Sequence, residues 1–115
     1  MLKIISANVN GIRSAYKKGF YEYIATSGAD IVCVQELKAQ EADLSDDMKN
    51  PHGMHGYWHC AEKRGYSGVA VYSKRKPDNV QIGMGIEEIR PCIRVVQSYI
   101  NHFHCFSLCS GEWLR

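Results

Sequence analysis

The amino-acid sequence predicts an α/β fold that begins with two parallel β-strands joined by a helix. Two observations support this prediction. Two short apolar runs, residues 2–7 and 31–34, flank a segment with helical periodicity, which is the order of a βαβ unit. Further strand-like segments then follow, separated by turn residues. A chain of 115 residues can bury one modest core, so we expect a single folded unit.

The two strands of this unit are expected to bring polar side chains together. The first strand, residues 2–7, ends at an Asn-Val-Asn-Gly turn. The second strand, residues 31–34, is apolar at every position, which is typical of a strand buried on both faces. Because parallel strands end at the same edge of a sheet, Asn8 and Glu36 are predicted to lie close together.

The connecting helix is predicted from the spacing of four residues. Phe20, Tyr21, Ile24 and Ala25 recur at helical intervals and would form one face. Gly28 follows at the position of a helix C-cap. We therefore expect an amphipathic helix of about three turns between the two strands.

The remaining elements are shorter. In chain order they are a short helix with an irregular loop (41–56), a strand (57–61), a turn (65–68), a strand (69–73), a short strand (80–82) and two strands (94–100 and 103–108). Hairpins are expected to connect the middle strands. From residue 89 onward Asp is absent and three of the five cysteines occur. We therefore divide the chain into an N-terminal part, residues 1–88, and a divergent tail, residues 89–115.

Composition excludes few functions. The net charge of +2 is too small to indicate nucleic-acid binding by itself. No apolar stretch reaches the ~18 residues of a membrane span, and no signal-peptide core is present. Five cysteines without regular spacing favour reduced thiols over a disulfide framework. We expect a cytoplasmic protein without a membrane partner.

Glu36 and Asn8 are the candidate metal ligands, because carboxylate and amide oxygens are hard ligands suited to Mg²⁺. Magnesium keeps several waters and takes one or two protein carboxylates, so a sparse ligand set is compatible with it. The alternative is that Glu36 is a solvated loop charge and that Asn8 only forms a turn. These two residues alone leave both interpretations open.

Three motifs occur in order along the chain. They are Asn-Val-Asn-Gly-Ile-Arg at 8–13, Gln-Glu-Leu-Lys at 35–38 and Gly-Tyr-Ser-Gly-Val-Ala at 65–70. In this combination the chain resembles the exonuclease III and apurinic/apyrimidinic (AP) endonuclease family, within the larger endonuclease/exonuclease/phosphatase superfamily. The resemblance covers residues 1 to about 88. It implies the first part of a four-layer α/β/β/α sandwich.

The resemblance also implies an enzyme and its site. The family hydrolyses phosphodiester bonds of double-stranded DNA at abasic sites and 3′ ends, with Mg²⁺ or with Mn²⁺ in its place. As catalytic residues, Glu36 would bind the metal and Asn8 would lie beside it and orient the attacking water or the phosphate. Asn10 matches a position that is often acidic in relatives. The residues that match DNA-backbone contacts are Arg13, Lys38, Gly65 and Tyr66. No obligate protein partner is implied.

The sequence departs from the family pattern in its later part. It contains no Tyr-x-Pro-x-Gly, Gly-Asp-x-Asn or Ser-Asp-His segment. We therefore expect an N-terminal fragment that is nearly inactive alone, because losing a catalytic base costs about 100- to 10,000-fold. An incomplete sandwich would expose apolar surface, so aggregation or oligomer formation is also expected. A reading-frame shift and a natural divergent tail would each explain residues 89–115.

Other functions remain open at this point. A phosphatase or phosphodiesterase of the same superfamily shares the Asn8 and Glu36 motifs. A non-catalytic DNA-binding remnant would retain Arg13 and Lys38 and bind DNA in a salt-sensitive way without turnover. A zinc or redox module would use the His/Cys cluster at 102–109, whose spacing matches no usual zinc finger. The sequence does not decide between endonuclease and exonuclease activity.

Overall fold

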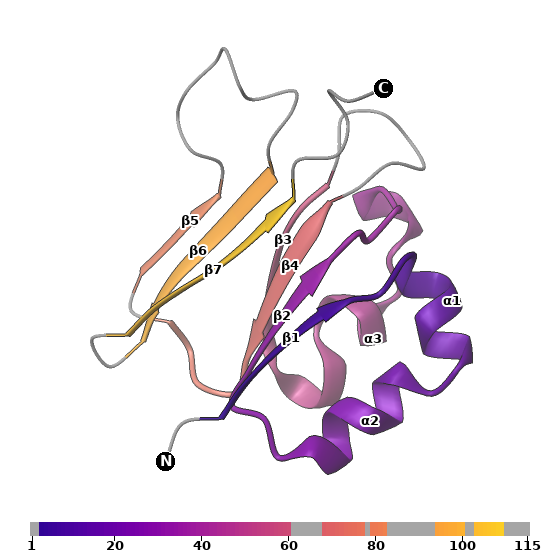
Figure 1. The fold of residues 1–115 in the computed structure, drawn as a ribbon, viewed down its shortest axis with the longest axis horizontal. Helices are drawn as coiled ribbons and strands as arrows, with labels where there is room; N and C mark the ends of the chain where they lie inside the picture. The colour runs from indigo at the N-terminus through magenta and orange to yellow at the C-terminus, as the bar shows by residue number, and fades with distance from the viewer. Residues whose placement is uncertain (1–2, 61–67, 78, 83–93, 101–102, 110–115) are drawn as a thin grey trace.

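The computed structural model describes residues 3–60, 68–77, 79–82, 94–100 and 103–109, and Figure 1 shows their arrangement. The strands are β1 (Ile4–Asn8), β2 (Ile31–Gln35), β3 (His55–His59), β4 (Val69–Ser73), β5 (Asn79–Ile82), β6 (Arg94–Ile100) and β7 (Phe103–Cys109). The helices are α1 (Ile12–Lys17), α2 (Phe20–Ser27) and α3 (Asp46–Lys49), with 3-10 turns η1 (Glu41–Asp43) and η2 (Pro51–Gly53). The predicted α/β class is confirmed.

The first sheet has the strand order β1-β2-β4-β3. β1 and β2 run parallel, and their register pairs Ile4 with Ile31 and Asn8 with Gln35. The predicted βαβ unit is therefore confirmed, with α1 and α2 in the crossover. β4 runs antiparallel to both of its neighbours, β2 and β3. The chain thus places β4 between two strands that precede it in sequence.

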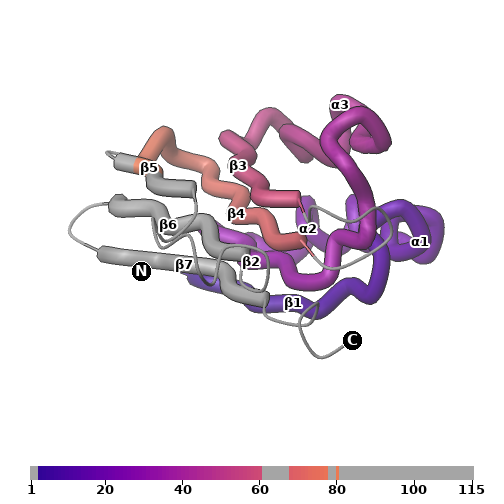
Figure 2. Tube along the Cα trace, turned by 90° about the horizontal axis from the view of Figure 1, so that it is seen from above, coloured from indigo at the N-terminus to yellow at the C-terminus, as the bar shows by residue number. Residues whose placement is uncertain are grey.

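β5, β6 and β7 form a second, antiparallel sheet in that order. This sheet packs over β2, β3 and β4, while the helices cover the opposite face of the first sheet (Figures 1 and 2). The described residues thus provide three layers of the predicted sandwich, and they include no helix on the outer face of the second sheet. β6 and β7 confirm the last two predicted strands, whereas the proposed boundary at residue 88 lies outside the described residues.

The core of the first sheet has two sides, and β2 contributes to both. Val32 and Val34 pack toward the helices together with Tyr72. Ile31 and Cys33 pack toward the second sheet. Because successive side chains of a strand point to opposite faces, a strand covered on both faces needs apolar residues at every position. The predicted two-sided burial of β2 is confirmed, since Ile31 and Val34 have no exposed surface.

α2 ends where the sequence predicts. Gly28 follows it with a φ of 71°, the left-handed conformation that glycine adopts without Cβ strain. Ile24 is buried and Phe20 is partly buried, but Ala25, predicted on the same face, is exposed. The sequence does not predict α1, because this helix has six residues, a single buried residue, Ile12, and no side-chain N-cap.

The predicted short helix and loop of residues 41–56 comprise η1, α3 and η2. Two tyrosines from other elements anchor α3. The hydroxyl of Tyr16 donates to the Asp47 carbonyl at 2.8 Å, and the hydroxyl of Tyr72 donates to the Met48 carbonyl. Burial raises the pKa of both phenols above the ordinary value, so both remain protonated donors. These contacts fix α3 against α1 and β4.

β3 begins at His55, two residues before the strand predicted at 57–61. The difference centres on Gly56, which a sequence pattern assigns to a loop. A Cβ at this position would lie 1.8 Å from the Lys49 carbonyl oxygen. Glycine therefore occurs within the strand because the end of α3 approaches its backbone closely.

Two general features complete the fold. No helix in the described part of the chain is long and apolar enough to cross a membrane. Cys33 and Cys60 are not in disulfides. The side chains of the three other cysteines lie outside the described residues.

Candidate metal and phosphate site

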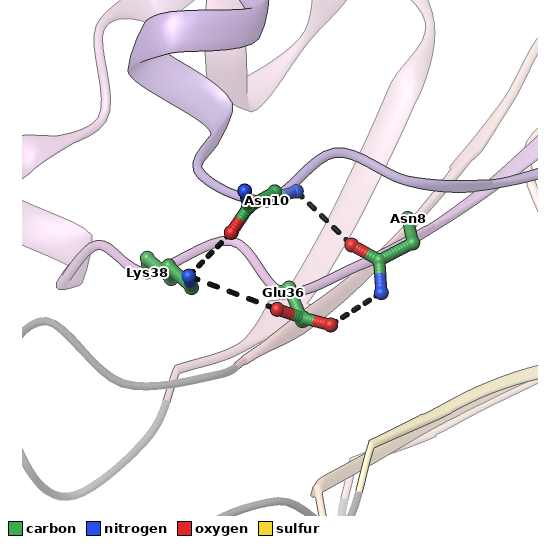
Figure 3. Close-up of polar contacts among 4 residues, drawn as sticks. All are labelled: Asn8, Asn10, Glu36 and Lys38. Atoms are coloured by element: carbon green, nitrogen blue, oxygen red, sulfur yellow. Dashed lines mark hydrogen bonds and ion pairs between the residues drawn. The ribbon is translucent and has the colours of Figure 1, made fainter.

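The candidate site lies where the parallel strands β1 and β2 end. Asn8 is the last residue of β1, and Glu36 directly follows β2. Asn8 Nδ2 donates a hydrogen bond to Glu36 Oε2, and Asn10 N donates to Asn8 Oδ1 at 3.1 Å (Figure 3). The parallel register therefore brings Asn8 and Glu36 together, as the sequence predicts.

Lys38 completes the group. Lys38 Nζ donates to Asn10 Oδ1 and lies 3.8 Å from Glu36 Oε1 (Figure 3). The side chains of Lys38 and Glu36 are 37% and 35% exposed, so their ion pair is solvated and stabilises the fold little. Asn8, Asn10, Glu36 and Lys38 thus form a closed polar group, the site ring, with one negative and one positive charge.

Backbone hydrogen bonds fix the two loops that carry the site ring. The Gly11 amide donates to the Glu36 carbonyl at 2.8 Å, and the Ile12 amide donates to the Leu37 carbonyl at 2.9 Å. These bonds join the loops after β1 and β2. The Leu37 amide donates to the Gly68 carbonyl at 3.1 Å, which ties the second loop to the start of β4. The directions of the ring side chains therefore follow from an ordered backbone.

Three members of the site ring have left-handed backbone conformations. The φ angles of Asn10, Glu36 and Lys38 are 48°, 56° and 53°. Asn tolerates this region, whereas Glu and Lys are strained in it. Arg13 helps to hold the strained loop, because its guanidinium donates to the Lys38 carbonyl at 3.3 Å. Observed strain of this kind concentrates at functional sites.

An open pocket of about 440 Å³ adjoins the site ring. Asn8 and Asn10 line one side, and Lys18, Phe20 and Tyr23 line another. The rings of Phe20 and Tyr23 stack with centroids 6.4 Å apart, and Tyr23 is 52% exposed. The site ring is therefore accessible to solvent beside β1, an outer strand of the first sheet.

Comparison with known proteins establishes the family of this chain. The model of the endonuclease/exonuclease/phosphatase family matches residues 5–110. The chain belongs to this family. An exodeoxyribonuclease of Bacillus subtilis is 46% identical over 88 residues, which are 76% of this chain and 34% of that protein. The DNA repair nuclease APEX1 of Danio rerio is 43% identical over 89 residues, 76% of this chain and 29% of its own length.

Solved structures share the family fold. An AP endonuclease from Archaeoglobus fulgidus superposes with a TM-score of 0.74 at 26% identity, covering 92% of this chain and 40% of its own. A 3′ phosphatase from Neisseria bound to a product DNA hairpin gives a TM-score of 0.76 with the same coverage, at 24% identity. The chain spans about a third or less of the curated relatives that it matches. The predicted resemblance to exonuclease III and AP endonucleases is confirmed.

The family match also crosses residue 88, where the sequence predicts that the family character ends. The matched range includes β6 and β7, which continue the second sheet. The division into residues 1–88 and a tail stays a prediction. The side chains of the His/Cys cluster at 102–109, which the zinc alternative requires, lie outside the described residues.

Glu36 matches the requirements of a divalent cation in part. Its partly exposed carboxylate is a hard oxygen ligand. The described residues contain no group of three or more His, Cys, Asp or Glu side chains that could hold a metal, so water would complete the coordination, as Mg²⁺ prefers. The Asn8 oxygen accepts from Asn10 while its amide nitrogen faces Glu36. Asn8 therefore orients the carboxylate, and its role as a ligand stays a prediction.

Two of the four predicted DNA-contact residues are described, and they lie together. Arg13 donates to the Lys38 carbonyl, next to the site ring. Gly65 and Tyr66 lie outside the described residues. The sequence does not predict the contact between Lys38 and Asn10, although both residues follow strand ends that it places side by side. Their shared position at these strand ends was the signal from which the contact could have been predicted.

Proposed function

We propose that this chain carries part of the active site of a DNA-repair nuclease of the exonuclease III type. The reaction would be Mg²⁺-dependent hydrolysis of DNA phosphodiester bonds at abasic sites and 3′ ends, in the cytoplasm and without an obligate protein partner. The site ring is the main support, because it combines an accessible carboxylate with a cationic side chain beside a pocket. Relatives named exodeoxyribonuclease and DNA repair nuclease support the reaction class.

Each described residue has a specific role in this proposal. Glu36 binds Mg²⁺, or Mn²⁺ in its place, and Asn8 orients the carboxylate. The bound cation supplies stabilisation of negative charge on the phosphate and the leaving oxygen. Arg13 and Lys38 contact backbone phosphates, because long basic side chains neutralise phosphates without reading sequence. Gly65 and Tyr66 are proposed as further backbone contacts.

Binding to a duplex with one abasic site tests the phosphate contacts. Fluorescence anisotropy over a KCl series, with Ca²⁺ in place of Mg²⁺, compares the wild-type chain with Arg13→Ala and Lys38→Ala. We expect several-fold weaker binding for each variant, and a salt slope smaller by about one. Lys49→Ala is the matched control, since Lys49 lies over the Trp58 ring. Equal binding by all four chains would reject these contacts.

Incision of the same duplex separates a nuclease from the second candidate, a non-catalytic DNA-binding remnant. Cutting that requires Mg²⁺ and is lost in Glu36→Gln supports hydrolysis at this site. Glu22→Gln is the control, because Glu22 is exposed on α2. We expect a rate about 100- to 10,000-fold below that of a longer family member, the cost of a missing base. A comparable rate would contradict this expectation, and binding without cutting would favour the remnant.

A further inference from the structure

The position of the Lys38 ammonium group is the starting point for an inference about how the site takes up a metal ion. Lys38 Nζ lies 3.8 Å from Glu36 Oε1. Asn10 Oδ1 accepts a hydrogen bond from the same ammonium group and so holds it there (Figure 3). The positive charge of Lys38 therefore stands beside the oxygen atoms that a cation would bind.

We propose that Lys38 is the built-in counter-ion of Glu36, which a divalent cation displaces from the carboxylate and thereby releases toward a DNA phosphate. This inference rests on the proposed function, since it assumes that Glu36 is the metal ligand. It adds that metal binding and phosphate binding are coupled through one lysine. Lys38 is then a positioning residue for the phosphate and a competitor of the metal ion.

The charges of the site ring support the competition. Glu36 is its one carboxylate and Lys38 is its one cation, because the two other members are neutral amides. A doubly charged ion on Glu36 would repel an ammonium group that stayed about 4 Å away, and in water-like surroundings this repulsion corresponds to about a 30-fold loss of metal affinity. An ammonium group on a flexible four-carbon chain can instead move away. Metal binding then costs only the Glu36 ion pair and the Asn10 hydrogen bond of Lys38, which corresponds to about a tenfold loss of affinity.

The contacts of Lys38 and Asn10 indicate which part of Lys38 would move when a metal ion binds and which part would stay in place. The Lys38 backbone is left-handed and its carbonyl accepts a hydrogen bond from Arg13, which holds it in place, so the movement is confined to the side chain. The neutral Asn10 oxygen accepts from the ammonium group without adding a second negative charge. Once a divalent cation neutralises Glu36, the strongest acceptor left for Lys38 would be a phosphate oxygen.

Binding of Mn²⁺ in the absence of DNA tests the competition directly. The electron paramagnetic resonance signal of free Mn²⁺ measures the dissociation constant for the full chain and its variants. We expect Lys38→Met to bind Mn²⁺ about tenfold more tightly than wild type. Lys38→Arg keeps the charge and should stay within about twofold, and Lys49→Met, which lies outside the site ring, should not differ. Glu36→Gln should lose this binding.

A second measurement tests whether the metal ion releases Lys38 toward a DNA phosphate. The affinity for the abasic duplex is compared between wild type and Lys38→Gln, once with EDTA and once with Ca²⁺. Lys38→Gln preserves a polar group for Asn10, and its circular dichroism spectrum confirms folding. We expect the loss of affinity to be at least about threefold greater with Ca²⁺ than with EDTA, because only then is Lys38 free to reach the phosphate.

The outcomes distinguish this inference from the proposed function. Tighter Mn²⁺ binding by Lys38→Met and a larger Lys38 effect with Ca²⁺ support the counter-ion role. Unchanged or weaker Mn²⁺ binding by Lys38→Met, with binding still lost in Glu36→Gln, overturns that role and leaves Glu36 as the metal ligand. Mn²⁺ binding that is insensitive to Glu36→Gln overturns both the counter-ion role and the metal assignment.

Discussion

The central and outer strands of the first sheet differ in how deeply they are buried. Every residue of β4 is buried, and so are four of the five residues of β2. In β1, exposed and partly buried residues alternate, and all of β3 is partly buried. The candidate site draws on both kinds of strand, because Glu36 follows central β2 while Asn8 ends outer β1. The buried strand β2 thus stabilises the fold, while the neighbouring strand β1 leaves the site accessible to solvent.

The coverage of the sheet explains this difference. Helices pack on one face of β2 and β4, and the second sheet packs on the other. β1 lies at the end of the strand order, and Ile4 is 47% exposed. A side chain stabilises the folded state in proportion to the apolar surface that it removes from water. The central strands should therefore carry most of the free energy of unfolding.

The largest predicted effect is the truncation of a central side chain. Tyr72→Ala in β4 removes a ring that is 1% exposed, and we expect a loss of about 3–5 kcal/mol in the free energy of unfolding. Ile4→Ala in β1 is the matched control and should cost less than about 1 kcal/mol. Urea titration followed by tryptophan fluorescence measures both. Similar costs at the two positions would reject the division between central and outer strands.

A smaller loss of stability is expected for Gly56 in β3, an outer strand with one closely packed position. Gly56→Ala in β3 would place a Cβ 1.8 Å from the Lys49 carbonyl oxygen, so the backbone at the end of α3 must shift. We expect a cost of about 1–3 kcal/mol, in the range of overpacking. His55→Ala, in the same strand, should cost less. If Gly56→Ala were as well tolerated as His55→Ala, the close approach of α3 would not constrain β3.

The last prediction concerns the reactivity of two cysteines and involves no substitution. Burial, with Glu41 and Asp43 adding to it, raises the pKa of the Cys60 thiol to about 11. Because the thiolate is the reactive form, Cys60 should react with iodoacetamide at pH 8 about 100-fold more slowly than in the unfolded chain. Its rate should rise about tenfold per pH unit up to pH 10. Cys33, in β2 and 6% exposed, should stay protected throughout.

Peptide mapping by mass spectrometry resolves the two sites, and 8 M urea supplies the unfolded reference. The raised pKa also has a defined sign for stability. Folded Cys60 keeps its proton when the unfolded thiol has lost it. The contribution of Cys60 to the free energy of unfolding is therefore fully present below about pH 9 and is lost as the pH rises toward 11. Equal reactivity of Cys33 and Cys60 in the native chain would contradict the comparison of β2 with the end of β3.

The parts of the fold that the sequence predicts are those fixed by local patterns. The uniformly apolar segment at 31–34 indicates a strand covered on both faces, and the βαβ order places Asn8 beside Glu36. The position of β4 between β2 and β3 could not be predicted in this way, because pairing between distant segments leaves no local signal. α1 was missed for a related reason, since tertiary contacts, and not an amphipathic pattern, stabilise six residues.

The candidate site shows the same limit at the level of side chains. Sequence motifs supply Asn8, Glu36 and Lys38 as candidate site residues. The contact of Lys38 with Asn10 depends on left-handed conformations that Glu36 and Lys38 adopt against their intrinsic preference. Local propensity predicts the opposite for both residues, and such conflicts are expected where function overrides stability.

This left-handed backbone also limits how the chain can be engineered or can evolve. Glycine occupies that region without the strain that Glu36 and Lys38 bear, which is of order 1 kcal/mol each. Exchange of either residue for glycine would relieve the strain and remove the charge together. Selection for a more stable chain therefore favours glycine at these two positions, whereas the proposed site requires the charges of Glu36 and Lys38. A stabilised variant chosen without a functional screen would tend to lose this site first.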